Sequence, residues 1–299
     1  MAQTTHETKT GPVVDGTEDQ GEIYDRRTLT YANSFDDAWT STAIRAIEWC
    51  TGKLTILRMV NKFEKKNEYY RGQRFWGGAL EVMGINLTTP QDQYANIPKE
   101  GPVIVVANHP HGMVDGMILA ELIGQVRNDY RILTRSVLTG LDEAATSFMI
   151  PVPFPHDPEA QTKMLEMRGK AMEHLKEGGV VALFPSGVVM SSDDWFGPAQ
   201  EQEWNVFTAK MIRRSGAQVV PIFFPGSNSR AYQIANKLSP ILRQGLLLHE
   251  IVRSCNKPQS PVIGEPISDE DMKLLESDPR GFMAWLRKRT MALGKSRNP

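Results

Sequence analysis

Short apolar runs alternate with helical patterns from Pro102 onward, and this alternation constrains the fold more than any other feature of the chain. The runs expected to form strands lie at residues 103–107, 131–134, 180–184, 219–224, 246–252 and 261–264. Helical patterns lie between them at residues 113–126, 159–176 and 204–215. A strand, helix, strand order is typical of βαβ units. We therefore predict an α/β fold with a mixed, mostly parallel sheet flanked by helices.

Two helical segments are expected before this sheet. Apolar residues recur at spacings of three and four within residues 35–66, and a shorter pattern covers residues 70–83. Ser34 or Asp36 is placed to cap the first helix. The predicted domains are a flexible acidic tail (1–33), an amphipathic helical hairpin (34–84), and an α/β domain (85–299) that ends in a helix at 279–293.

Composition and charge exclude several classes of protein. The net charge of −1 lacks the basic footprint of a general nucleic-acid binder. Two cysteines, Cys50 and Cys255, cannot make a disulfide framework. No apolar run approaches the roughly 18 to 20 residues that span a bilayer, and the polar start lacks the pattern of a signal peptide. We expect no nucleic-acid partner and a reducing, cytoplasmic compartment.

The densest polar cluster, residues 108–116, reads NHPHGMVDG and directly follows the first expected strand of the sheet. Loops at the carboxyl ends of strands present side chains into a crevice. Histidine exchanges protons near neutral pH, and Asp115 lies close enough in sequence to orient the ring of His109. We predict a His109–Asp115 dyad that deprotonates an alcohol. Three neighbours are expected to contact the substrate: Asn108, His111 and Gly112.

Two other interpretations of this cluster remain open. His109 and Asp115 could cap the helix and hold the loop without any chemistry, because aspartate near a helix start commonly accepts backbone hydrogen bonds. Alternatively, His109, His111 and Asp115 could bind a metal ion as in metal-dependent hydrolases, with His156 as the other histidine placed to join. The general-base hypothesis needs no metal, and we expect none.

A second cluster, FPSG at residues 184–187, ends the expected strand at 180–184. Glycine allows a ligand to approach the backbone closely, and backbone amides can hold an oxyanion or a head-group oxygen. By itself such a sequence is more often a simple turn. Four residues of the cluster are predicted to contact the substrate: Phe184, Pro185, Ser186 and Gly187.

The two clusters together, Asn-His-x5-Asp and then Phe-Pro-x-Gly about 75 residues later, are far more specific than either alone. In this the chain resembles the glycerolipid (lysophospholipid) acyltransferase superfamily over about residues 70–270. The resemblance implies acyl transfer from a thioester of coenzyme A or acyl carrier protein to a lysolipid hydroxyl. His109 would then be the catalytic base and Asp115 its orienting partner, with no cofactor.

Two departures from the family pattern concern the acceptor. Ser186 stands where the family usually has glutamate, so an acidic contact to the acceptor is missing. No arginine lies between Arg135 and Arg168, where the family tends to grip a phosphate. We therefore expect a phosphate-free acceptor, a lyso-aminolipid such as a lyso-ornithine lipid, which an acyltransferase branch in bacteria uses. The alternatives are a 1-acylglycerol-3-phosphate acyltransferase and a non-catalytic lipid-binding protein.

Further candidates concern anionic groups and the membrane. Four residues are candidates for binding the head group or donor phosphates, although each arginine could equally be a solvated surface charge: Arg131, Arg135, Ser227 and Arg230. The helix at 35–66 carries Trp39 and Trp49, and the last helix carries Trp285. These helices could lie on a membrane or pack onto the domain. We expect a peripheral protein on the cytoplasmic face of the inner membrane.

Overall fold

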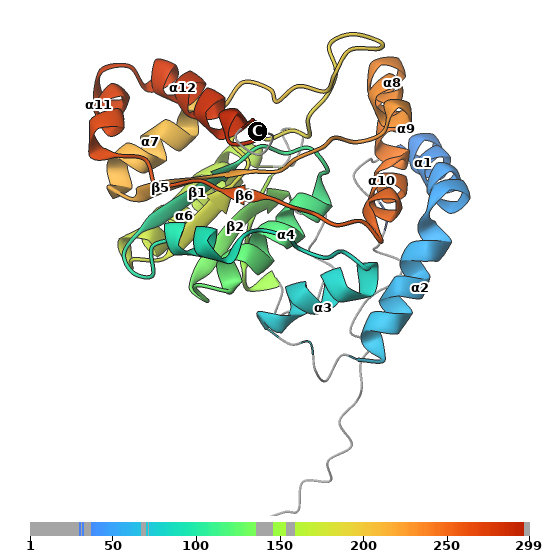
Figure 1. Cartoon of the computed structure of the whole chain (residues 1–299). Helices are drawn as coiled ribbons and strands as arrows, with labels where there is room; N and C mark the ends of the chain where they lie inside the picture. The colour runs from blue at the N-terminus through green and yellow to red at the C-terminus, as the bar shows by residue number, and fades with distance from the viewer. Residues whose placement is uncertain are drawn as a thin grey trace, which may run out of the picture.

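The computed structural model describes residues 30, 32, 37–66, 70, 72–135, 146–153 and 159–295. Six strands form one sheet in the order β3-β2-β4-β1-β5-β6 (Figure 1). The strands are β1 (Val103–Ala107), β2 (Tyr130–Arg135), β3 (Met149–Val152), β4 (Val180–Leu183), β5 (Gln218–Phe223) and β6 (Val262–Ile263). Every pair is parallel except β5 with β6. The predicted mixed, mostly parallel α/β sheet is confirmed.

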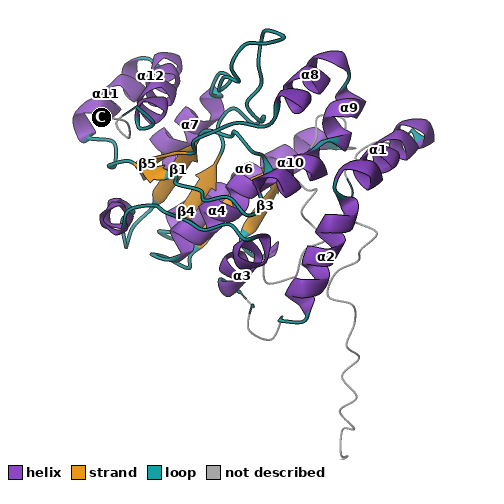
Figure 2. Cartoon of the chain, turned by 45° about the vertical axis from the view of Figure 1, so that its right-hand side comes forward, coloured by secondary structure: helices purple, strands orange, loops and turns teal. Residues whose placement is uncertain are grey.

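Helices cover both faces of the sheet and enclose two apolar cores (Figure 2). One core is closed by α2 (Lys53–Glu64), α3 (Arg74–Met83), α4 (Met113–Gly124) and α10 (Leu247–Ser254). The other is closed by α6 (Ala160–Lys176), α7 (Val206–Ser215), α11 (Asp269–Ser277) and α12 (Pro279–Ala292). The outer elements are α1 (Ala38–Thr51), α8 (Arg230–Leu238), α9 (Pro240–Gly245) and the 3-10 helix η3 (Gln91–Asn96). β1 is buried along its whole length, which explains its unbroken apolar sequence.

The N-terminal helical region differs from the single long helix expected over residues 35–66. It is interrupted at Gly52, which separates α1 from α2. A Cβ atom at Gly52 would lie 3.0 Å from the main-chain oxygen of Leu248 in α10, so the interruption is where α10 packs most closely. Asp37 caps α1, while Ser34, Asp36 and nearly all of the expected tail lie outside the described residues.

The expected strand at 246–252 is wrong, because this segment forms α10. Its apolar residues Leu248 and Ile251 are three positions apart and both are buried, which is helical spacing. A short apolar run does not by itself distinguish a strand from a helix. Strand β3 and helices α8, α9 and α11 were not expected from the sequence at all.

The last helix packs onto the domain. Asp278 caps α12, and the helix buries Phe282 and Leu286 completely against the sheet. Trp285 is partly buried in the same contact. Along the described ranges of the chain, no helix has both the length and the apolar character needed to cross a bilayer.

Candidate active site

The sheet order brings the two sequence clusters together. β1 lies between β4 and β5, and all three strands are parallel. The loops that follow these strands therefore leave the same edge of the sheet side by side. Asn108 follows β1, Phe184 follows β4, and Phe224 follows β5. Residues that are remote in sequence meet at this edge.

The carboxylate of Asp115, in the first turn of α4, is the centre of the cluster. Its Oδ2 atom accepts hydrogen bonds from the main-chain amides of His111 (2.7 Å) and Gly112 (3.1 Å) and lies 3.0 Å from Nδ1 of His109. Its Oδ1 atom lies 3.0 Å from Nδ1 of His111. The turn that makes this possible needs φ of +76° at Gly112. One carboxylate thus orients two imidazole rings through their Nδ1 atoms, which leaves both Nε2 atoms as acceptors when the rings are neutral.

The electrostatics of Asp115 suit an orienting partner. Burial alone would raise the pKa of this carboxyl group, but the charge of His111 and the hydrogen bonds from His109 and His111 outweigh burial and lower it. Asp115 is therefore ionised at neutral pH and stabilises a positive charge on His109. Within the part of the chain that the structure describes, no group of three or more His, Cys, Asp or Glu side chains could hold a metal ion. His156 lies outside that part.

The ring of His109 is held on a second side by Phe184. The two rings stack with their centroids 3.9 Å apart and their planes 17° from parallel. The side chain of His109 is 17% exposed, whereas that of Asp115 is fully buried. With its Nδ1 atom directed at Asp115, the ring presents Nε2 for proton transfer.

Asn108 connects two strand ends. Its side chain is fully buried, donates to the main-chain oxygen of Phe224 (2.8 Å) and accepts from the main-chain amide of the same residue (2.7 Å). Asn108 therefore holds the end of β1 against the end of β5 in a fixed register. Its expected contact with substrate stays a prediction.

The turn at residues 184–187 lies beside His109 through Phe184, as the sequence predicts. Gly187 adopts φ of +68°, and its amide donates to the main-chain oxygen of Phe184 at 2.9 Å. The main-chain oxygen of Pro185 accepts from Asn205 at 3.0 Å. The Ser186 hydroxyl donates to the main-chain oxygen of Val188 at 3.0 Å. The amide of Gly187 and the hydroxyl of Ser186 are therefore both engaged within the turn.

The loop after β5 lies against His111. A Cβ atom at Gly226, where φ is +94°, would come within 3.0 Å of Nε2 of His111. The partly exposed Ser227 follows directly. Arg230, at the start of α8, donates to the main-chain oxygen of Gly197 at 2.5 Å and so attaches α8 to the loop after β4.

The other two arginines predicted to bind anions are not brought to His109. Arg131 lies near the start of β2, paired with Val181 of β4, and donates to the main-chain oxygen of Tyr130 at 2.9 Å. Because the strands are parallel, this position is toward the opposite edge of the sheet from the dyad. The side chain of Arg135 lies outside the description, although its backbone belongs to β2.

Sequence reasoning missed Glu201. This residue of the loop between β4 and α7 is buried, and its Oε2 atom accepts the main-chain amide hydrogen of His109 at 3.1 Å. Its Oε1 atom accepts from Nε1 of Trp204 at 2.8 Å. No motif marks it in the sequence, because its contact with His109 depends on the path of a long loop.

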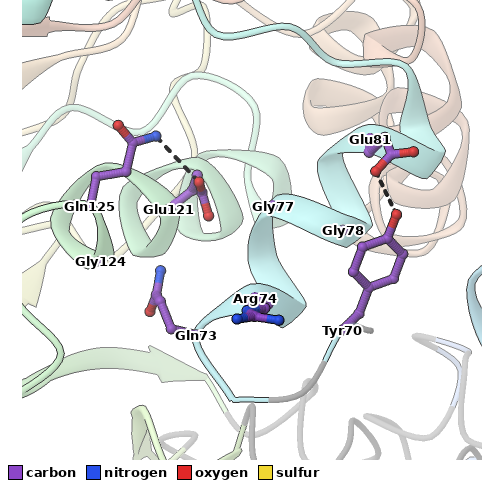
Figure 3. Close-up of a pocket in the computed structure, with 9 residues that line it drawn as sticks. All are labelled: Tyr70, Gln73, Arg74, Gly77, Gly78, Glu81, Glu121, Gly124 and Gln125. Carbon is purple, nitrogen blue, oxygen red and sulfur yellow. Dashed lines mark hydrogen bonds between the residues drawn. The ribbon is translucent and has the colours of Figure 1, made fainter. Parts of the chain in front are cut away.

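A cavity of about 280 Å³ lies between α3 and α4, away from the dyad (Figure 3). Its lining includes Gln73 and Arg74 from the start of α3 and Glu121 from the last turns of α4. Asp115 is six residues earlier on α4, about 9 Å along the helix axis. The cavity therefore belongs to the interface between two helices and not to the cluster around His109.

Comparison with known proteins found similarity to acyltransferases. An acyltransferase family model matches residues 91–225, which include both clusters. The lyso-glycine lipid O-acyltransferase of Phocaeicola vulgatus is 28% identical over 220 residues, which are 70% of this chain and 74% of that protein. The crystal structure of the 1-acyl-sn-glycerophosphate acyltransferase PlsC from Thermotoga maritima is 16% identical, with a TM-score of 0.43 over 72% of this chain and 78% of the other.

Proposed function

Because this chain belongs to the glycerolipid acyltransferase superfamily and is an acyl-transferring enzyme, we propose that it esterifies the hydroxyl of a lysolipid with a fatty acyl group from a thioester. The observation that carries the proposal is the His109–Asp115 pair at the carboxyl end of β1, with the ring stacked on Phe184. A histidine oriented by a buried carboxylate is the arrangement that general-base catalysis needs.

The proposed reaction uses His109 first as a base and then as an acid. Its Nε2 atom takes the proton of the acceptor hydroxyl while the hydroxyl oxygen attacks the thioester carbonyl carbon. The tetrahedral intermediate collapses as the carbon–sulfur bond breaks, and the leaving thiolate receives the proton from His109. The products are an ester and a free thiol. Asp115 stabilises the imidazolium between the two steps. We assign to Ser186 the contact with the oxyanion or the acceptor.

For the acceptor, we propose a lyso-aminolipid without a phosphate. The relative from Phocaeicola vulgatus is named for a lyso-glycine lipid, which supports this class. The absence of any arginine between Arg135 and Arg168 in the sequence points the same way, because a guanidinium is well suited to clamp a phosphate. Acyl-CoA and acyl carrier protein thioesters are both chemically competent donors.

We further propose that the enzyme works peripherally on the cytoplasmic face of a membrane. Both of its lipid substrates reside in or near a bilayer. Large apolar side chains are exposed on α1, α8 and the loop after β4. In Figure 1 this loop rises beside α8, and α1 lies next to α9 at the right of the view. The exposed side chains are Trp39, Trp49, Trp195, Phe196 and Leu238. Amphipathic side chains of this kind favour a membrane interface.

The test is an acyl-transfer assay with purified protein, palmitoyl-CoA or palmitoyl carrier protein as donor, and lyso-glycine lipid or lysophosphatidic acid as acceptor. We expect an esterified product from lyso-glycine lipid and at least a tenfold lower kcat/KM with lysophosphatidic acid. Preference for lysophosphatidic acid would contradict the proposed phosphate-free acceptor but would still support acyl transfer to a lysolipid. Tight binding of lysolipid without product from any pair would establish a lipid-binding protein instead.

A further inference from the structure

We propose that Glu201 is a second carboxylate supporting His109, which positions the main chain of the base and stabilises the charge it acquires; this inference rests on the proposed acyl transfer. Glu201 does not contact substrate in this assignment. It acts through His109, as Asp115 does, but from the opposite side of the residue. Asp115 holds the ring, and Glu201 holds the main-chain amide.

The hydrogen bonds of Glu201 call for the ionised form. Its two oxygens accept from two different donors, the His109 amide and the Trp204 indole. An ionised carboxylate only accepts, whereas a protonated carboxyl group carries one O–H that competes with these donors for space. The side chain is only 7% exposed, so water cannot easily replace either donor. Both oxygens of Glu201 therefore act as acceptors in a buried position next to His109.

Other charged groups surround this pair. Asp115 lies on the ring of His109, and His111 lies on the other oxygen of Asp115. From α12, Arg287 donates to the main-chain oxygen of Glu201 at 3.2 Å. His109 therefore contacts two buried carboxylates, one through its ring and one through its main-chain amide. When His109 takes the proton of the acceptor, both carboxylates stabilise the imidazolium.

This arrangement has a consequence at low pH. Burial raises the pKa of Glu201, and the hydrogen bonds from His109 and Trp204 only partly offset it. As the pH falls, Glu201 is protonated earlier than an ordinary glutamate. The site then loses the charge that supports His109, so acyl transfer should become slower.

The main experiment compares wild type with Glu201→Gln, using Glu203→Gln as a matched control at an exposed neighbour. The kcat, the KM for palmitoyl-CoA and the pH dependence of kcat/KM are measured with lyso-glycine lipid as acceptor. Glu201→Gln should lower kcat about 10- to 100-fold and change KM less than about twofold, since the lost interaction is with the base. On the acid side, wild type should lose kcat/KM as Glu201 is protonated, and this loss should be absent in Glu201→Gln. Glu203→Gln should match wild type in all three.

A second variant, Trp204→Phe, keeps the carboxyl group of Glu201 but removes one of its hydrogen-bond donors. Loss of the indole donor should raise the pKa of Glu201 further, because one bond to the ionised form is gone. The loss of activity that follows protonation of Glu201 should then begin at higher pH than in wild type. A circular dichroism spectrum and a melting curve for each variant separate this effect from loss of folding.

A measurement that needs no substrate separates this inference from the proposed reaction. The ring resonance of His109, assigned with His109→Asn, is followed against pH by NMR. We expect an inflection in wild type that follows the protonation of Glu201 and is absent in Glu201→Gln. The same curve in wild type and Glu201→Gln would overturn the role of Glu201. Wild type that transfers no acyl group but shows this inflection would overturn the reaction alone.

Discussion

The loop after β1 and the loop after β4 leave neighbouring strands at the same edge of the sheet, yet they are built in opposite ways. The β1 loop is short and closes on itself, because Asp115 accepts hydrogen bonds from within residues 109–112 and is fully buried. The β4 loop runs on to α7 and exposes Val188, Trp195 and Phe196. The first loop is suited to fixed chemistry, and the second to contact with a partner outside the protein.

The two loops are also joined to the rest of the molecule differently. The β1 loop is connected to the core of the sheet through Asn108 and Phe224. The β4 loop is attached to α8 near its tip, where Arg230 donates to Gly197 and the ammonium group of Lys237 lies 5.9 Å from the ring centroid of Trp195. Changes in the β1 loop should therefore affect turnover and stability, and changes at the tip of the β4 loop should affect access to lipid.

The largest effect is expected from His109→Ala. Removal of the general base should lower kcat about 100- to 10,000-fold while the protein stays folded, since the ring is a partly exposed side chain at a loop. The measurement is the initial rate of acyl transfer, with His174→Ala on α6 as a control. Near-normal turnover in His109→Ala would eliminate the dyad mechanism.

Asn108→Ala should be the most destabilising change in this set. It leaves the main-chain N–H and C=O of Phe224 without their side-chain partner at a fully buried position. We expect a loss of about 2 to 4 kcal/mol in the free energy of unfolding, from two lost hydrogen bonds. Urea denaturation measures it. A loss below about 0.5 kcal/mol, on the order of a surface substitution, would mean that the two strand ends do not depend on Asn108.

Asp115→Asn should cost about 1 to 3 kcal/mol of stability at pH 7, together with most of the activity. Because the folded protein lowers the pKa of Asp115, its ionised form stabilises the fold above the pKa of the unfolded chain. That contribution is lost as the pH falls through the lower, folded pKa. The stability difference between wild type and variant should therefore shrink below about pH 4. A difference that stays constant down to about pH 2 would contradict the assignment of charge.

The smallest effect on chemistry is expected at the tip of the β4 loop. The double variant Trp195→Ser/Phe196→Ser should weaken binding to anionic phospholipid vesicles about 5- to 20-fold, because two interfacial aromatic side chains are lost. Its kcat with detergent-dispersed lysolipid should stay within about twofold of wild type. Vesicle flotation measures the first quantity, and Leu274→Ser, at an exposed position on α11, is the control. Equal flotation of the double variant and wild type would remove the loop from the membrane contact.

Much of the sheet could be predicted from local pattern, and some helices could not. The runs at β1, β4 and β5 are apolar along nearly their whole length, as buried parallel strands are. The segment of α10 was misassigned as a strand, because its few apolar residues do not distinguish the two-residue period of a strand from the 3.6-residue period of a helix. The interruption at Gly52 depends on a neighbour from about 200 residues later, the main-chain oxygen of Leu248.

The same division applies to the site. His109 and Asp115 are six residues apart, and the turn at Gly112 is enough to bring them together, so a local motif identifies them. Glu201 reaches His109 only because β4 pairs with β1 and the loop after β4 folds back. Arg131 shows the converse, since its residue type suited an anion site while its place near the start of β2 keeps it away.

The amino-acid sequence by itself determined the α/β class, the strands next to the site and the pairing of His109 with Asp115, because these depend on periodicity and on contacts between near neighbours. Only the tertiary structure decided that β1 lies between β4 and β5, that His111 shares Asp115 with His109, and that Glu201 accepts the main-chain amide hydrogen of His109. Strand order and loop paths are set by the packing of the whole domain, which no short stretch of sequence encodes.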